Sequence, residues 1–167
     1  GSAVTTGVQN TLIGGNAGDA LTTGAYNIAI GYQALGDEDT GNSSIGIGYY
    51  ALSKQNNDSS NYNIAIGHSS GGEITSGIYN TLMGGLAGQS LVIGNNNVAV
   101  GMQALSTSVD GDHNTAVGYR ALQDYEDGDG NGHNTAIGNS SQLNATTGEF
   151  NTSLGSLSMG AGVTTGD

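Results

Sequence analysis

Short apolar triplets recur along the whole chain, and each one ends at a glycine. Most copies follow an asparagine and approximate the pattern N-[T/I/V]-[A/L]-[I/V/M/L]-G. The first and third triplet residues are β-branched or large aliphatic, whereas the middle residue is small in most copies. Since strand side chains alternate between two faces and β-branched residues favour strands, each triplet predicts a short strand. The copies occupy residues 10–14, 27–31, 44–48, 63–67, 80–84, 97–101, 114–118, 134–138 and 151–155.

The spacing of these triplets is nearly constant. Their closing glycines stand at positions 14, 31, 48, 67, 84, 101, 118, 138 and 155, so six of the eight steps are 17 residues and the other two are 19 and 20. The longer steps add residues between Tyr50 and Asn63 and between Arg120 and Asn134. A fixed step interrupted by insertions is typical of a solenoid. The sequence therefore predicts an all-β fold, a parallel β-solenoid (β-roll) of about nine 17-residue coils, in one domain over residues 3–167.

The two faces of the predicted strand differ in bulk, as Ile28 and Ile30 do from Ala29. We expect the bulky face to fill the core and the flat, small face to lie against another chain. A second inward row is expected at the leucines that follow the corner, namely Leu35, Leu52, Leu105 and Leu122. Rings recur directly before the anchor asparagine, at Tyr26, Tyr62, Tyr79, His113, His133 and Phe150, and we expect them to stack between coils.

Composition and charge narrow the classes of partner. The chain has 31 Gly, no Pro and no Cys, which excludes disulfides and thiolate metal sites, and its glycines follow no collagen triplet. A net charge of −12 disfavours nucleic acids and anionic lipid headgroups. No apolar run reaches the ~18 residues of a membrane helix, so we expect no membrane insertion. Gly1 and Ser2 are interpreted as a cloning scar on a segment of a longer protein.

Catalytic signatures are scarce. The chain lacks a Cys nucleophile, H-E-x-x-H, G-x-x-x-x-G-K-[S/T] and G-x-S-x-G. Acids share loops around Asp37 and Asp124, but a glycan-cleaving solenoid would need a defined pair of carboxylates ~5 to 10 Å apart. Acidic loops without a base are usually solvated surface. We therefore expect that the chain is not an enzyme.

The two insertions are the expected recognition loops, since they escape the regular coil geometry. Residues 54–61 are polar and rich in Asn. The second insertion, residues 123–132, carries Tyr125 among acids, and the nearby Tyr119 and Arg120 offer an aromatic face and a forked donor for sugar hydroxyls or a carboxylate. The residues predicted for this ligand site are Tyr119, Arg120, Asp124, Tyr125 and Glu126. The alternative is that Tyr119 is only a ring of the stack and Arg120 a solitary surface charge.

The second insertion also contains an incomplete calcium motif. Asp127, Asp129 and Asn131 match the start of a D-x-D-x-N-G loop, which supplies oxygen ligands at alternate positions. The bidentate Glu expected eleven residues after Asp127 is replaced by Gly138. A bound calcium ion and an ion-free acidic loop are both open interpretations, and no other cofactor is expected.

The repeats resemble those of known fibres. The segments 96–101 (N-N-V-A-V-G) and 62–67 (Y-N-I-A-I-G) resemble the N-x-V-A-I-G head repeats of trimeric, YadA-like autotransporter adhesins. Residues 114–122 (N-T-A-V-G-Y-R-A-L) are similar to repeats in phage tail fibres and related bacterial surface fibres. The resemblance implies a left-handed parallel β-roll that forms a homotrimer, with the small Ala column close to a neighbouring chain. It also implies an extracellular location, at the cell surface or on a virion tail fibre.

The functional hypothesis is a structural or adhesive fibre segment whose loops recognise a neutral or cationic ligand, namely a surface glycan or a protein receptor. An ice-binding solenoid is the first alternative, because Thr11, Thr81, Thr115, Thr135 and Thr152 share one column. That column is interrupted by Ile and Val and belongs to the face assigned to the core. A spacer stalk without a ligand is the second alternative.

Overall fold

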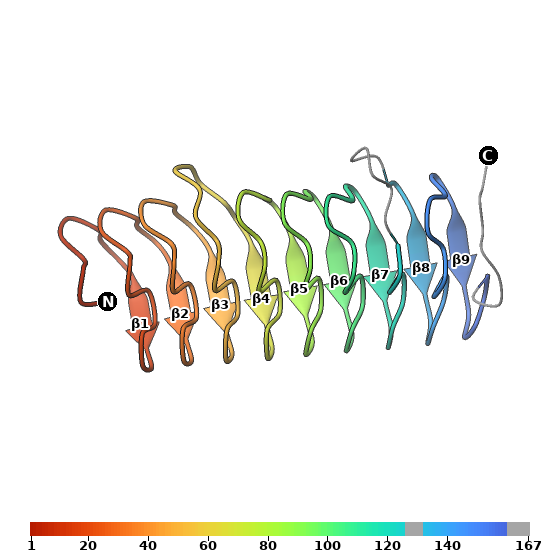
Figure 1. Ribbon diagram of the computed structural model, residues 1–167, viewed down its shortest axis with the longest axis horizontal. Helices are drawn as coiled ribbons and strands as arrows, with labels where there is room; N and C mark the ends of the chain where they lie inside the picture. Colours follow the sequence, from red (N-terminus) through yellow and green to blue (C-terminus); the bar gives the residue numbers. More distant parts are fainter. Residues whose placement is uncertain (126–131, 160–167) are drawn as a thin grey trace.

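The computed structural model describes residues 1–125 and 132–159, and in this part of the chain nine short strands form one parallel sheet. The strands follow one another in sequence order along a rod, with one strand per coil (Figure 1). Each coil is named here by its strand. The strands are β1 (Thr11–Ile13), β2 (Ile28–Ile30), β3 (Ile45–Ile47), β4 (Ile64–Ile66), β5 (Thr81–Met83), β6 (Val98–Val100), β7 (Thr115–Val117), β8 (Thr135–Ile137) and β9 (Thr152–Leu154). The predicted parallel β-solenoid is confirmed.

The register keeps like residues in line. Ile30 pairs with Ile47, and Ala99 pairs with Ala116, as the 17-residue step requires. The longer steps preserve the same columns, since Ile45 pairs with Ile64 across the first insertion and Thr115 with Thr135 across the second. Both insertions are therefore absorbed outside the strands.

The chain that returns from each corner also stacks on the next coil. Leu35 N donates to Ala51 O at 3.0 Å and Asp37 N to Ser53 O at 3.0 Å, although this segment is no regular strand. At the corner itself, a Cβ on Gly31 would lie 2.5 Å from Gly48 O, and Gly31 has a φ of 130°. Only glycine fits this approach of successive backbones, which explains why every triplet closes with one.

The prediction of which strand face is inward is wrong. The small middle residues, such as Ala29, Ala65 and Ala99, are fully buried, and so is the larger Leu82. The flanking Ile28 and its counterparts are only half-buried or exposed, because they point away from the coil interior. Where the returning segment supplies a leucine, the interior leaves room only for a small residue in this row, so the bulky columns lie outside. The small Ala column consequently cannot be a surface between chains.

The core is built from the small strand column and the predicted leucine row, which is confirmed: Leu35, Leu52, Leu105 and Leu122 are at most 1% exposed. The β5 coil uses the opposite arrangement. Leu82 occupies the strand position, and a Cβ on Gly71 or Gly88, at the leucine-row position, would lie 2.9 Å from its methyl groups. In each layer of the core, a large side chain is thus supplied either by the strand position or by the leucine-row position after the corner, but not by both.

The anchor asparagines form a buried ladder beside the sheet. The Asn80 Oδ1 atom accepts the Asn97 backbone N–H at 3.0 Å, and the Asn80 Nδ2 atom donates to Gly94 O at 2.8 Å. Asn27, Asn63, Asn97 and Asn134 repeat both bonds. Each side chain therefore satisfies one donor and one acceptor of the following coil, which stabilises the stacking without any apolar contact.

Candidate functional site

The outward face of the sheet is a strip in which an unbroken aliphatic column runs beside a column that mixes Thr with Ile and Val. We define the outward face as the first and third residues of all nine strands. Its first column contains Thr, Ile and Val only, and its second contains Ile, Val, Met and Leu. Exposure is highest in the end coils, at Ile13 (57%) and Leu154 (76%), and most other residues of this face are half-buried. Eight steps of ~4.8 Å between the nine strands give the strip a length of about 38 Å.

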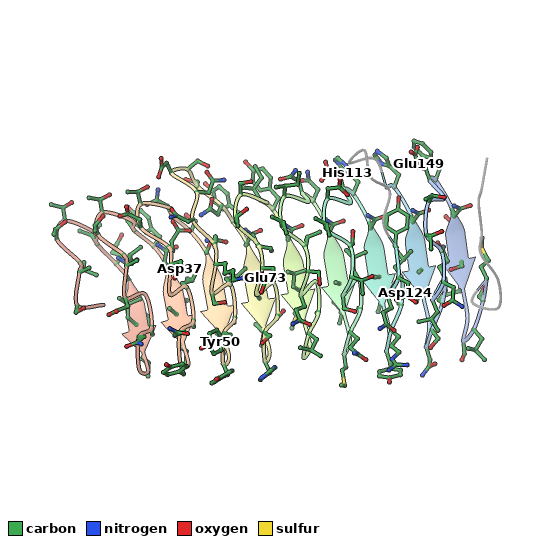
Figure 2. The ribbon with its side chains drawn as sticks, in the orientation of Figure 1. Asp37, Tyr50, Glu73, His113, Asp124 and Glu149 are labelled. Atoms are coloured by element: carbon green, nitrogen blue, oxygen red, sulfur yellow. The ribbon has the colours of Figure 1, made fainter. Side chains whose placement is uncertain are left out.

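Rings flank the outward face at both ends of the strands, and those before the anchor asparagines stack as the sequence predicted. His113 stacks on His133 with ring centroids 4.6 Å apart, and His133 stacks on Phe150 at 4.9 Å. At the other strand end, Tyr49 stacks on Tyr32 at 5.5 Å and on His68 at 5.3 Å. Figure 2 shows His113 and Tyr50 at opposite strand ends. The histidines thus belong to the ring stacks, and the apolar surface extends beyond the strands.

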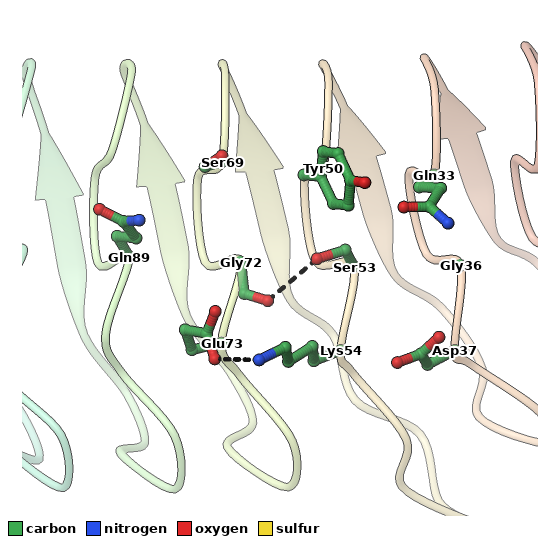
Figure 3. Close-up of a pocket in the computed structure, with 10 residues that line it drawn as sticks. All are labelled: Gln33, Gly36, Asp37, Tyr50, Ser53, Lys54, Ser69, Gly72, Glu73 and Gln89. Carbon is green, nitrogen blue, oxygen red and sulfur yellow. Dashed lines mark hydrogen bonds and ion pairs between the residues drawn. The ribbon is translucent and has the colours of Figure 1, made fainter.

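A polar groove of about 360 Å³ lies over the β2 to β5 coils, on the corners and the returning segments (Figure 3). We define the groove by the side chains of Gln33, Asp37, Tyr50, Lys54, Glu73 and Gln89, with Ser53 and Ser69 between them. Asp37, Lys54 and Glu73 stand six residues after their closing glycines and therefore occupy one column on three successive coils.

The groove is hollow because its floor has little side-chain bulk. Gly36 and Gly72 occupy a column that holds Gln89 and Gln123 in the β5 and β7 coils. A Cβ on Gly72 would meet Ser69 O at 3.3 Å and Tyr50 O at 3.5 Å, and Gly72 has no positive φ. Glycine at this position is thus not required by the backbone conformation, and a side chain would need only a small shift of Ser69 O. The missing side chain leaves the hollow.

Several groups of the groove are held in place. Lys54 Nζ bonds Glu73 Oε2, and Ser53 Oγ donates to Gly72 O at 3.1 Å. The hydrogen bond to Glu73 raises the pKa of Lys54, so the ammonium stays charged between two carboxylates. The Tyr50 ring packs edge-on against Tyr49 at 4.5 Å and Tyr32 at 5.7 Å, and desolvation raises its pKa.

A buried polar cluster lies inside the same coils. Glu38 is fully buried and accepts hydrogen bonds from Gly41 N (2.8 Å), Gln55 Nε2 (2.7 Å) and Asn61 Nδ2 (3.0 Å). Burial raises the pKa of Glu38, although these hydrogen bonds oppose the shift. Gln55 also bonds Ser44 and Asn63, and so replaces the amide that Ser44 lacks in the asparagine ladder.

The structure separates the residues predicted at the second insertion. Tyr119 is exposed, and Arg120 lies over its ring at 5.0 Å while donating to Gln103 Oε1 at 3.0 Å. Asp124 is half-buried on the same column as Asp37. Tyr125 is fully buried, so its ring fills the core and does not face a ligand at the surface.

The remaining predicted residues, Glu126, Asp127, Asp129 and Asn131, lie outside the described residues. Over residues 1–125 and 132–159, no group of three or more His, Cys, Asp or Glu is placed to hold a metal ion. In the same part of the chain there is no helix of the length and apolarity needed to cross a bilayer.

Sequence reasoning missed the groove and the buried Glu38. A signal for Glu38 was available, because it stands seven residues after its closing glycine, in the column of Leu21, Ile74 and Leu91. The groove had a weaker signal in the sequence. Gly36 and Gly72 provide no side chains in the coils on either side of Lys54, which is the only lysine of the chain.

Comparison of this chain with protein-family models, with curated proteins and with solved structures gives no match.

Proposed function

We propose that this chain is a rigid segment of an extracellular fibre that assembles as a homotrimer through its outward face. The observation that carries the proposal is the aliphatic column that runs unbroken over nine strands, beside a column of Thr, Ile and Val and with stacked rings near both strand ends. Apolar strips of this extent mark contact surfaces, and the strand part alone covers roughly 400 Å². The interface thus differs from the one that the sequence suggested.

The physical need for a partner follows from the thin core. Each coil buries mainly one alanine or leucine from the strand and one or two residues from the returning segment. A narrow interior gives limited hydrophobic stabilisation, whereas covering the outward Ile and Val columns adds ~25 cal/mol per Å². The trimeric number and the location, on a cell surface or a virion tail fibre, rest on the resemblance to adhesin-head and tail-fibre repeats.

The assembly is tested by charging the outward face. Val98→Lys places a cation in the middle of the strip without changing the interior, because Val98 points outward beside the buried Ala99. Sedimentation equilibrium should show a trimer for the wild type and a smaller species for V98K. The matched control is Thr23→Lys, on an exposed turn, which should remain trimeric. A monomeric wild type, or a V98K variant that stays trimeric, contradicts the proposal.

In this role the segment supplies length and a surface for recognition, and it acts without catalysis or a cofactor. The repeated hydrogen bonds between coils favour a stiff rod, since each coil is bonded to the next along the strand, the returning segment and the asparagine ladder. Polyanions are disfavoured partners because the chain carries −12. A rod of this kind serves as a spacer, an adhesive segment or both.

Ice binding is a second candidate, favoured by one observation. The column with Thr81, Thr115 and Thr135 faces outward on a flat sheet, contrary to its expected place in the core. The adjacent outward column is entirely aliphatic, which suits a protein contact better than ordered water. Thermal hysteresis measured on a monomeric sample would support this candidate, and its absence would remove it.

A further inference from the structure

We infer that the polar groove over the β2 to β5 coils is a binding site for an uncharged oligosaccharide, a chain of neutral hexose or N-acetylhexosamine units lying along the rod. The inference deepens the recognition role proposed above. It does not depend on trimerisation, because the groove lies on corners and returning segments and not on the outward face.

The groove has the size and lining of a sugar site. Its volume of about 360 Å³ falls in the range of small-molecule sites. The lining joins carboxylates, primary amides, an ammonium and hydroxyls, which together can both donate to and accept from adjacent sugar hydroxyls. Tyr50 supplies the one aromatic ring of this lining, and the apolar C–H face of a pyranose can pack against such a ring.

The groups of the groove lie in two rows. Figure 3 shows Asp37, Lys54 and Glu73 in a row along the returning segments, with Gln33, Tyr50 and Ser69 in a second row near the corners. Lys54 pairs with Glu73 at the surface, and the Tyr50 ring packs edge-on against Tyr49 and Tyr32. A ring packed in this way loses little entropy on binding.

The two rows repeat at the spacing of the coils, ~4.8 Å, which is close to the length of one sugar unit in an extended chain. Successive units can therefore meet equivalent positions on successive coils. A periodic site of this kind selects a periodic ligand and gives each unit a similar set of hydrogen bonds.

The net charge of the groove determines which classes of saccharide it can bind. The two carboxylates and Lys54 leave the groove with one net negative charge, on a chain of −12. Sulfated or polysialylated chains are repelled, and a simple cation is disfavoured because Lys54 already lies between the carboxylates. A peptide anchor would need an apolar pocket, whereas this lining is mostly polar.

The site is local to these coils. In the β6 to β8 coils the floor column holds Ser106, Gln123 and Leu143, and no glycine. Asp124 is the counterpart of Asp37 there, without a lysine beside it. These positions provide matched controls on the same molecule.

The test uses the whole chain on a printed array of neutral, sialylated and sulfated oligosaccharides, followed by titration calorimetry with the neutral oligosaccharide that binds best. Gly72→Gln should fill the groove with a side chain that the same column already carries as Gln89, and should weaken binding by about tenfold or more. Asp37→Asn and Lys54→Ala should weaken it as well. Leu143→Gln and Asp124→Asn should leave affinity unchanged.

Three results would overturn the inference: no neutral oligosaccharide bound, binding restricted to sulfated chains, or equal affinity of G72Q and the wild type. Loss of binding in D124N would place recognition at the second insertion instead. Sedimentation of the same samples separates this test from that of the trimer, because a monomer that binds through the groove contradicts only the assembly. Circular dichroism melts of G72Q and L143Q verify that both variants are folded.

Discussion

The two faces of each strand are built on opposite principles. Inward, Ala29, Ala65 and Ala99 are completely buried within one chain, and outward, Ile28 and Ile30 remain half-exposed. In an ordinary globular domain the larger side chains would be inside. Here the coil is so narrow that only a small residue fits beside a leucine of the returning segment, and the larger aliphatic side chains are left at the surface of the chain. The inward face determines whether a coil forms, and the outward face is the part of the strand that is free to contact other molecules.

The largest expected effect comes from enlarging the inward face. Ala116→Phe should destabilise the chain by more than ~3 kcal/mol, because the fully buried Ala116 is enclosed and its neighbours Ala99 and Ala136 pair with it directly. Chemical denaturation followed by circular dichroism measures the loss. The outward counterpart Val117→Phe should leave the fold intact, and equal destabilisation by both variants would contradict the assignment of the faces.

A cavity should have the next largest effect. Leu82→Ala removes the side chain that fills the space over Gly71 and Gly88, and should cost ~2 to 5 kcal/mol. Adding Gly88→Leu rebuilds the arrangement of the β3 coil, where Leu52 takes this position with a φ of 51°. The double variant should regain part of the lost stability in the same denaturation experiment. A double variant less stable than L82A would show that strand and corner do not share this volume.

The inward Glu38 should give the rod a pH-dependent stability that outward acids do not. Because burial raises its pKa, the folded chain holds a proton at a pH where the unfolded chain has released it. Its contribution to stability therefore increases as the pH falls through the raised folded-state pKa, and the buried carboxylate is unfavourable above it. Urea unfolding between pH 4 and 8 should show that Glu38→Gln flattens this dependence.

The control for this titration is an exposed carboxylate. Asp58→Asn, on the first insertion, should leave the pH dependence as it is in the wild type. In E38Q, Asn61 can turn its unpaired Oδ1 atom toward the new amide, whereas Gln55 Nε2 loses one acceptor and keeps Ser44 Oγ. The comparison therefore uses the slope of the pH profile and not the absolute stability. Parallel pH profiles of E38Q and the wild type would show that Glu38 does not titrate as an isolated buried acid.

The smallest effect is expected when one residue of the outward face is replaced by another of similar size. Val98→Thr reproduces the residue found in this column in β5 and β7, and should change the free energy of unfolding of the single chain by less than ~0.5 kcal/mol. The free energy of unfolding should be measured at low protein concentration, where any oligomer has dissociated. A larger change would mean that the outward column contributes to the coil itself.

The repeat made the fold predictable, since its period fixed the parallel register, the two insertions and the stacked rings. The orientation of the strand was not fixed by alternation, because alternation shows which residues share a face but not which face is inside. The anchor asparagine held the missing signal: it shares the face of the middle residue, and its amide is needed inside to bond the next coil. The pairing of Leu82 with Gly88, and of Leu12 with Gly18, was a second signal.

The site was less predictable for a physical reason. Tyr125 could have been placed in the core by counting seven residues from Gly118, as for Leu91 from Gly84. The groove depends instead on the relative lengths of side chains on four neighbouring coils, and no single repeat contains that information. Recognition surfaces on a solenoid form across neighbouring repeats, so a search for motifs within a single repeat does not detect them.

The asparagine ladder also has an evolutionary consequence. Each anchor asparagine bonds the coil that comes one turn later, whichever coil that is, so excision or duplication of one 17-residue unit joins ends that already fit. Unequal recombination can therefore shorten or lengthen the rod in whole steps without a misfolded intermediate. The unit around Leu82 is one exception, because its loss would leave Gly71 facing an empty layer. The unit around Ser44 is another, because Gln55 and Asn61 bond the buried Glu38 of the preceding coil. The length of the rod can thus change easily during evolution, except by loss of these two units.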